Sequence, residues 1–100
     1  MKALSVRQPW ANHIIIGIKE IEYRSWSTDY RGPLLICSSK TPDEGGEDLP
    51  LGMALSVVDL AYVAKSGAHV YKWYLKNPRK LERPFPVKGQ IKLFDVDYEE

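Results

Sequence analysis

Segments in which apolar and polar residues alternate with a period of two recur along most of this 100-residue chain, and only one segment has helical spacing. A period of two is typical of a strand with one buried side and one solvent-facing side. Alternation, or a short run of apolar and β-branched residues, predicts six strands, at residues 2–6, 20–26, 34–37, 52–63, 70–76 and 91–96. Strands and helices do not alternate and no internal repeat is present, so a doubly wound sheet is disfavoured.

The helical segment lies near the N-terminus. Pro9 fits the first turn of a helix, where its missing N–H costs nothing. Trp10, Ile14 and Ile18 then recur at helical spacing, and Gly17 suits a helix end that needs a left-handed conformation. The elements together predict a mostly β (α+β) fold with one or two helices, most simply a small β-barrel of about six strands with an early helix.

The composition supports one folded domain over residues 1–100. Hydrophobic residues make up 44% and charged residues 27% of the chain, near the globular average and far from disordered sequences. A chain of this length hides roughly 65% of its unfolded surface, so it needs neither a metal nor a disulfide to fold. Its apolar runs are far shorter than the roughly 20 residues that span a bilayer, and Cys37 has no partner for a disulfide. We therefore expect a cytoplasmic protein without membrane association.

Acidic residues are concentrated in two short stretches, although the net charge is only +1. Four acids lie in residues 43–48 and four in residues 95–100, and neither stretch contains Lys or Arg. Without these eight, five of the 13 acids remain against 14 bases, which gives the rest of the chain a charge of +9. Such a basic body suits a polyanionic partner, unless the acidic stretches fold back and neutralise it.

Ligands for a metal or a catalytic cysteine are scarce. His13, His69 and Cys37 stand far apart, and no metal-ligand spacing joins them. Cys37 follows an apolar run, where a free cysteine usually serves as a small buried hydrophobe. We predict no metal site and no cofactor.

A polar and aromatic cluster occupies the second predicted strand and its flanks. Glu22 and Arg24 are two residues apart and therefore face the same side, roughly 6.5 to 7 Å from each other. A carboxylate beside a guanidinium can read the edge of a base or orient a water, and the alternative is a surface ion pair worth about 0 to 1 kcal/mol. Trp10 and Trp26 are candidate stacking platforms, or else core residues.

A second strip has a similar character. Lys72, Tyr74 and Lys76 share one face of a predicted strand, and interleaved basic and aromatic residues are typical of surfaces that bind single-stranded nucleic acid. The alternative is a solvated edge strand protected by lysine.

Longer motifs carry a resemblance to a known family. They are K-A-L-S-V-R-Q-P-W at residues 2–10, G-I-K-E-I-E-Y-R-S-W at 17–26, Y-R-G-P-L-L-I at 30–36, Y-K-W-Y-L at 71–75 and P-F-P-V-K-G-Q at 84–90. Over nearly its whole length the sequence resembles the ASCH domain family of the PUA-like superfamily. That resemblance implies a small β-barrel with an early helix and an RNA- or nucleotide-binding role.

The resemblance also implies a basic, aromatic-edged cleft between helix and barrel. Ten residues would line it, namely Arg7, Gln8, Pro9, Trp10, Lys19, Glu22, Arg24, Trp26, Ser39 and Lys40. Arg24 and Lys19 would contact phosphate and Glu22 a base edge. Lys19 has the opposite strand parity from Glu22 and Arg24, so it joins them only if the helix–strand junction turns it inward.

Two alternatives to a binding module remain open. Some similar proteins are amidohydrolases with a lysine, threonine and glutamate constellation, but here Glu22 stands at the threonine position, Thr28 is distant and Asp59 is merely the nearest later acid. A ribonuclease would use Lys19 and Glu22 as catalytic residues. A protein-interaction module would instead dock a partner through the acidic loop at residues 43–48. The sequence leaves the oligomeric state undetermined.

Overall fold

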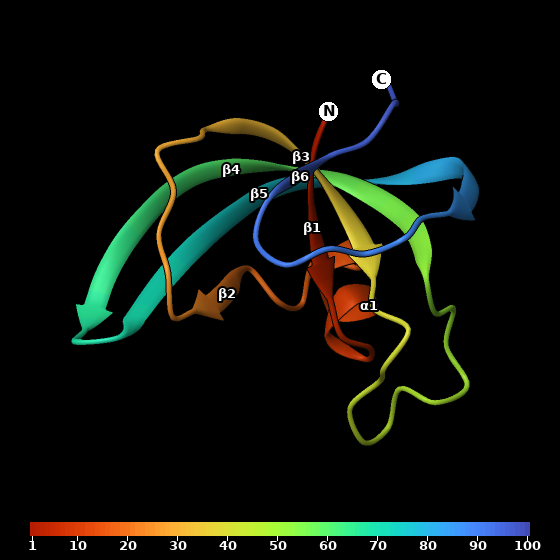
Figure 1. Ribbon diagram of the computed structural model, residues 1–100, viewed down its shortest axis with the longest axis horizontal. Helices are drawn as coiled ribbons and strands as arrows, with labels where there is room; N and C mark the ends of the chain where they lie inside the picture. Colours follow the sequence, from red (N-terminus) through yellow and green to blue (C-terminus); the bar gives the residue numbers. More distant parts are fainter.

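Six strands form one sheet, and a single short helix packs against it in the computed structural model, which describes residues 1–100 (Figure 1). The elements are β1 (Lys2–Val6), α1 (Trp10–Ile15), β2 (Ile21–Arg24), β3 (Gly32–Ser38), β4 (Met53–Gly67), β5 (Val70–Pro86) and β6 (Phe94–Asp95). The strand order across the sheet is β2-β5-β4-β3-β1-β6. The predicted mostly β, barrel-like fold class with an early helix is confirmed.

A long antiparallel hairpin of β4 and β5 forms the middle of the fold. The two strands have 15 and 17 residues and extend beyond the predicted segments, which stopped at residues 63 and 76. Four register shifts interrupt their pairing, and each inserts extra residues that break the period of two. Bulges also increase bending and twist, and Figure 1 shows both strands curving side by side across the molecule.

The last strand is much shorter than predicted. Of residues 91–96, only Phe94 and Asp95 form β6, and they pair with Ala3 and Lys2 of β1. Lys92 has φ of 59°, a left-handed conformation that does not belong to an extended strand. Beyond Ala3, the edge of β1 that faces β6 therefore has no strand partner.

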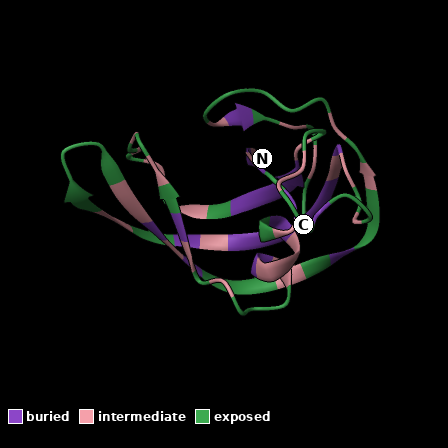
Figure 2. Cartoon of the chain, turned by 90° about the horizontal axis from the view of Figure 1, so that it is seen from below, coloured by how far each residue is buried: buried purple, intermediate pink, exposed green.

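The middle of the sheet is buried on both sides. One core contains Leu4, Trp73 and the helix residues Ala11 and Ile14, and the other contains Phe94 and Leu81. Successive residues of β3 enter the two cores in turn, with residues 34 and 36 in the first and residues 35 and 37 in the second. The prediction that this strand is buried on both sides is confirmed, and Figure 2 shows buried segments along the middle of the sheet.

Cys37 belongs to the second core. Its side chain is fully buried, and this burial raises the pKa of its thiol to about 12. A thiol with so high a pKa is not a nucleophile at neutral pH, so the structural interpretation of this residue is confirmed.

The acidic stretches fold back onto basic residues of the body. Asp43 pairs with Arg7, Asp95 with Lys2, and Glu100 with Arg79. The hydrogen bond from Arg79 to Glu100 is the largest cause of a raised pKa for that guanidinium. Part of the +9 charge is thus neutralised within the molecule.

The one helix has six residues, and no helix of the structure is long and apolar enough to cross a membrane.

Candidate ligand-binding cleft

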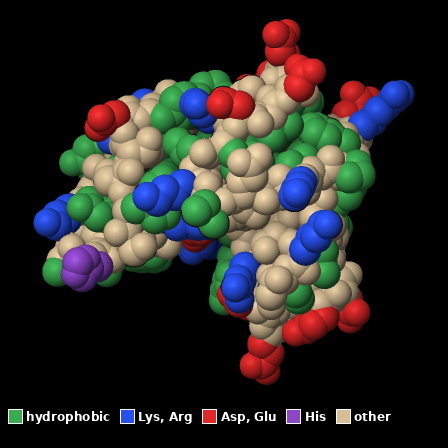
Figure 3. Space-filling view, in the orientation of Figure 1, with side chains coloured by type: hydrophobic (Ala, Val, Ile, Leu, Met, Phe, Trp, Pro, Cys, Tyr) green, Lys and Arg blue, Asp and Glu red, His purple; other side chains and the backbone are tan.

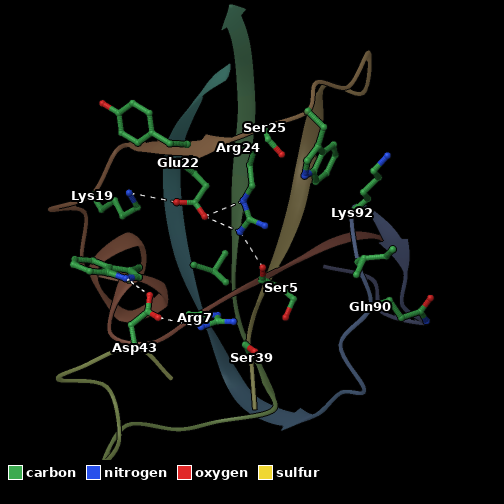
Figure 4. A pocket seen from close by; sticks show the side chains of 15 residues that line it. Ser5, Arg7, Lys19, Glu22, Arg24, Ser25, Ser39, Asp43, Gln90 and Lys92 are labelled. Carbon is green, nitrogen blue, oxygen red and sulfur yellow. Dashed lines mark hydrogen bonds and ion pairs between the residues drawn. The ribbon is translucent and has the colours of Figure 1, made fainter. Parts of the chain in front are cut away.

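A cleft of about 800 Å³ opens where the two edges of the curled sheet approach without pairing (Figure 4). β2 and the residues just after it form one side, residues 90–92 form another, and the unpaired end of β1 lies between them. The lining residues are Ser5, Val6, Arg7, Trp10, Lys19, Glu22, Tyr23, Arg24, Ser25, Trp26, Ser39, Asp43, Gln90, Ile91 and Lys92.

Glu22 is the central charged residue of the cleft. It is 8% exposed, and its pairing with Trp73 on β5 fixes its place in the sheet. The Arg24 Nη2 and Nε atoms donate to Glu22 Oε2 at 2.7 and 3.1 Å, and Lys19 Nζ lies 3.3 Å from Oε1. One carboxylate therefore holds two cations on the cleft wall (Figure 4). Because the group is largely buried, it is more than a solvated surface pair.

Lys19 joins this group although its strand parity is wrong. It lies before β2, in a turn where the Ile18 and Lys19 amides both donate to His13 O, so strand alternation does not apply to it. Its ammonium donates to Ile21 O at 2.8 Å and lies 5.5 Å from the centre of the Tyr23 ring. The helix–strand junction thus turns Lys19 inward, as its predicted place beside Glu22 and Arg24 requires.

Arg24 bridges the opening of the sheet. Its Nη2 atom also donates to the carbonyl of Ser5 at 2.9 Å, on the part of β1 that β6 leaves unpaired. The side chain thereby joins β2 to β1 across the gap where the two edges of the sheet do not pair, which we call the seam. The Nη1 atom makes no hydrogen bond within the protein, so this donor is available to a ligand.

A carboxylate of the acidic loop forms part of the opposite wall. Asp43 Oδ2 accepts from Trp10 Nε1 at 2.9 Å, and Oδ1 accepts from Arg7 Nη1 at 3.2 Å. The Asp43 amide donates to Gln8 O at 2.8 Å, which anchors the loop beside α1. Sequence reasoning assigned Asp43 to a loop and missed its place in the cleft, because nothing local indicates a contact that spans more than 30 residues.

The structure brings seven of the ten predicted site residues to the cleft, namely Arg7, Trp10, Lys19, Glu22, Arg24, Trp26 and Ser39. Gln8, Pro9 and Lys40 do not line it. Gln8 is fully buried, donates to Asn12 Oδ1 and Pro50 O, and accepts from the Asn12 amide. It ties the start of α1 to the loop instead of facing a ligand. Lys40 is exposed, and its stem lies beside Gly52.

The two candidate stacking residues differ in availability. Trp10 is 41% exposed on the rim. Trp26 packs edge-on against the buried Trp73, with ring centres 4.8 Å apart, and its carbonyl accepts from Trp73 Nε1. Trp26 therefore contributes to the core as well as to the cleft, whereas Trp10 has an exposed ring whose Nε1 is held by Asp43.

Residues 90–92 were not predicted as part of the site. They bend past β1 where a strand was expected, and Gln90, Ile91 and Lys92 reach the cleft. Gly89 permits this approach, since a Cβ atom there would lie 3.0 Å from Ser5 Oγ. A glycine just before an exposed polar segment is the signal that sequence reasoning could have used.

The cleft lacks the other parts of a hydrolase constellation. Thr28 and Asp59 do not line it, and Asp59 pairs with Arg79 at 3.0 Å on β4. No group of three or more His, Cys, Asp or Glu side chains is placed to hold a metal ion.

The fold and the cleft together define a small barrel-like α+β domain with a charged cleft at its open seam. Residues 4–85 match the model of the ASCH domain, so the chain belongs to the ASCH domain family, a PUA-like family generally associated with RNA binding. Activating signal cointegrator 1 of Homo sapiens is 30% identical over an alignment 127 residues long, which covers 94% of this chain and 22% of the relative. The protein of the same name from Mus musculus is 29% identical over the same shares. The chain spans about a fifth of the length of these curated relatives.

Proposed function

We propose that this domain binds RNA or a nucleotide-like ligand in the cleft. The observation that carries the proposal is the shared carboxylate of Glu22, which holds Lys19 and Arg24 in fixed positions and leaves Arg24 Nη1 without a protein acceptor. A preorganised guanidinium with a free donor suits a phosphate oxygen. Lys19 supplies a second cation. Glu22 has further lone pairs with which to accept from the edge of a base.

The charge balance of the wall supports an anionic ligand. Arg7, Lys19, Arg24 and Lys92 carry positive charge there, against only Glu22 and Asp43. Because the wall is partly shielded from solvent, this excess acts more strongly than it would on an open surface.

Aromatic side chains at the rim support a ligand with bases. Trp10, Tyr23 and Trp26 border the same cleft. Recognition of unpaired nucleotides commonly combines aromatic stacking with contacts to phosphate. The cleft supplies both within one volume.

Binding is favoured over hydrolysis by the same contacts. Both oxygens of Glu22 are engaged by Lys19 and Arg24, so the carboxylate is used to hold these two cations in place. A role for Lys19 and Glu22 in ribonuclease or amidohydrolase chemistry is therefore the second candidate. Docking of a protein through the acidic loop is the third, and Asp43 of that loop already contacts the cleft.

A titration that follows tryptophan fluorescence tests the proposal. The purified protein is titrated with short single-stranded RNA and with modified nucleosides at low and moderate salt, and the same tubes are assayed for product. We expect quenching, weaker RNA binding at higher salt and no product. Arg24→Gln should weaken binding at least about tenfold, whereas Arg83→Gln, an exposed arginine outside the cleft, serves as the matched control. Salt-independent binding would contradict the phosphate contacts, and product lost in Glu22→Gln would make the domain an enzyme.

A further inference from the structure

A second surface with basic and aromatic side chains lies on the side of β2, β5 and β4 that faces away from the core. The sheet register places Tyr23 of β2 beside Lys72 of β5, and Tyr74 of β5 beside Tyr62 of β4. Tyr23 and Tyr62 are 54% and 58% exposed, and the rings of Tyr62 and Tyr74 lie 5.8 Å apart. We call these four residues, together with Lys76, the outer tyrosine–lysine face.

Protection of a sheet edge does not explain Lys72. Lysine often guards an edge strand against pairing with another chain. Lys72 pairs with Tyr23 of β2 and with Ala64 of β4, so it stands in the interior of the sheet, whereas Lys76 pairs with Asp59 of β4 and lies beyond the end of the β2 pairing. The edge-strand alternative from the sequence is therefore wrong for Lys72, and this lysine remains to be explained.

The positive charge of the outer tyrosine–lysine face is concentrated toward the cleft. Neither Lys72 nor Lys76 forms an ion pair. Two acids lie near Lys76, since Asp59 is its partner in the register and Glu20 lines the same shallow hollow. Lys72 has instead the neutral neighbours Tyr23 and Ala64.

The outer tyrosine–lysine face is continuous with the cleft. Tyr23 lines the cleft and is also the first residue of the face, and the Lys19 ammonium near its ring contacts Glu22 inside. Neighbouring strands are about 4.8 Å apart, so Tyr23, Lys72 and Ala64 span about 10 Å from the rim outward. Figure 3 shows basic and hydrophobic side chains interleaved over the part of the molecule where Figure 1 draws β2 and the hairpin.

We propose that single-stranded RNA held in the cleft continues over Tyr23 onto the outer tyrosine–lysine face. Bases stack on the tyrosines and Lys72 contacts a phosphate, much as exposed aromatics on an open sheet stack two or three bases. The proposal rests on the proposed function and specifies it, because it makes the ligand a polymer and not a free nucleotide.

Length-dependent binding tests the proposal. Affinity is measured for a nucleoside monophosphate, which fills only the cleft, and for an eight-residue single-stranded RNA. Tyr62→Ala should weaken binding of the RNA at least about fivefold and leave the mononucleotide unaffected. Tyr62→Phe keeps the ring and should bind as the wild type does. Lys72→Gln should reduce the slope of log K against log salt by about 0.7 for the RNA alone, and Lys80→Gln, exposed and elsewhere on β5, is its control.

The outcomes separate this proposal from the one on which it rests. If the wild type binds both ligands and Tyr62→Ala and Lys72→Gln change neither, the cleft function stands and the extended track is wrong. If Tyr62→Ala weakens both ligands equally, the effect is structural and the track is again contradicted. If the wild type binds neither ligand, both proposals fail. Competition by polyglutamate as strong as that by RNA would assign the face to acidic polypeptides.

Discussion

At the scale of single residues, two carboxylates are the acceptors for four of the side chains that line the cleft. Glu22 is the acceptor for both Lys19 and Arg24, and Asp43 is the acceptor for both Arg7 and Trp10. Each carboxylate therefore sets the position and the availability of two potential ligand contacts.

Removing the charge of Glu22 should cost stability. Glu22→Gln keeps the shape of the side chain but leaves Lys19 and Arg24 without a counter-charge in a largely buried setting. We expect the free energy of unfolding to fall by about 1 to 3 kcal/mol, measured by urea denaturation. Glu82→Gln changes an exposed carboxylate without an ion pair and should leave the midpoint unchanged. Equal stability of the two variants would show that the carboxylate does not hold the cations.

Removing the charge of Asp43 should strengthen ligand binding. Its carboxylate occupies Arg7 and Trp10, two groups that could otherwise contact a ligand phosphate and base. Asp43→Asn should therefore raise the affinity for single-stranded RNA by about threefold to tenfold at low salt. The measurement is a fluorescence titration beside Glu44→Gln, which neutralises an exposed acid of the same loop. Unchanged affinity in Asp43→Asn would mean that the ligand does not reach this wall.

At the scale of elements, β3 connects the two cores and contains the only cysteine. The pKa of Cys37 is raised from 9.0 to about 12, so the folded state keeps the proton that the unfolded chain releases above about pH 9. The contribution of this thiol to stability is therefore complete below pH 9 and decreases as the pH rises toward 12.

A pH series of urea denaturation isolates that contribution. Between pH 8.5 and 10.5 the wild type should lose more stability than Cys37→Ala, because only the wild type has the thiol that ionises on unfolding. Parallel pH profiles for the two proteins would show that the thiol is accessible in the folded state.

The loop at residues 41–50 is anchored by close packing as well as by Asp43. A Cβ atom on Gly46 would lie 2.3 Å from the backbone carbonyl of Gln8. Gly46→Ala should therefore push the loop from α1 and lower the free energy of unfolding by about 1 to 3 kcal/mol, measured by urea denaturation. Glu44→Ala at an exposed position of the loop is the control, and a Gly46→Ala protein as stable as this control would contradict the packing.

The elements could be predicted from the sequence where periodicity was local. Alternation placed β1 at Lys2–Val6 and put Glu22 and Arg24 on one face, and both features are observed. Bulges in the β4–β5 hairpin hid the true length of those strands, because each bulge changes the parity of the residues after it. Asp43 and Lys92 reach the cleft through long-range packing, which a local pattern does not encode.

At the scale of the whole molecule, the sheet is curled but its two edges are joined by one arginine. The hydrogen bond from Arg24 to Ser5 O connects β2 to β1 where no strand pairing exists. This hydrogen bond therefore links the two sides of the cleft, and a ligand bound to Arg24 would contact the same side chain.

Loss of this link should loosen the seam and not the cores. Arg24→Met keeps an apolar stem but removes the bond to Ser5, so we expect faster amide hydrogen exchange in β2 and unchanged exchange in β3 and β4. Arg83→Met, outside the cleft, is the control. Exchange that rises uniformly over the sheet would indicate global destabilisation instead.

The burial of β3 on both sides has a consequence for strand alignment during folding. In most sheets a slip by one residue moves apolar side chains into water, and that penalty fixes the alignment. Here a slip would exchange Leu34 and Ile36 with Leu35 and Cys37, one apolar set for another. Polar contacts between the end of β3 and the start of β4 can then discriminate, namely the Met53 amide donating to Ser38 Oγ at 3.1 Å and the Gly52 amide donating to Ser38 O at 3.0 Å. Two hydrogen bonds at one end of the strand thus favour the correct alignment among competitors of similar hydrophobicity.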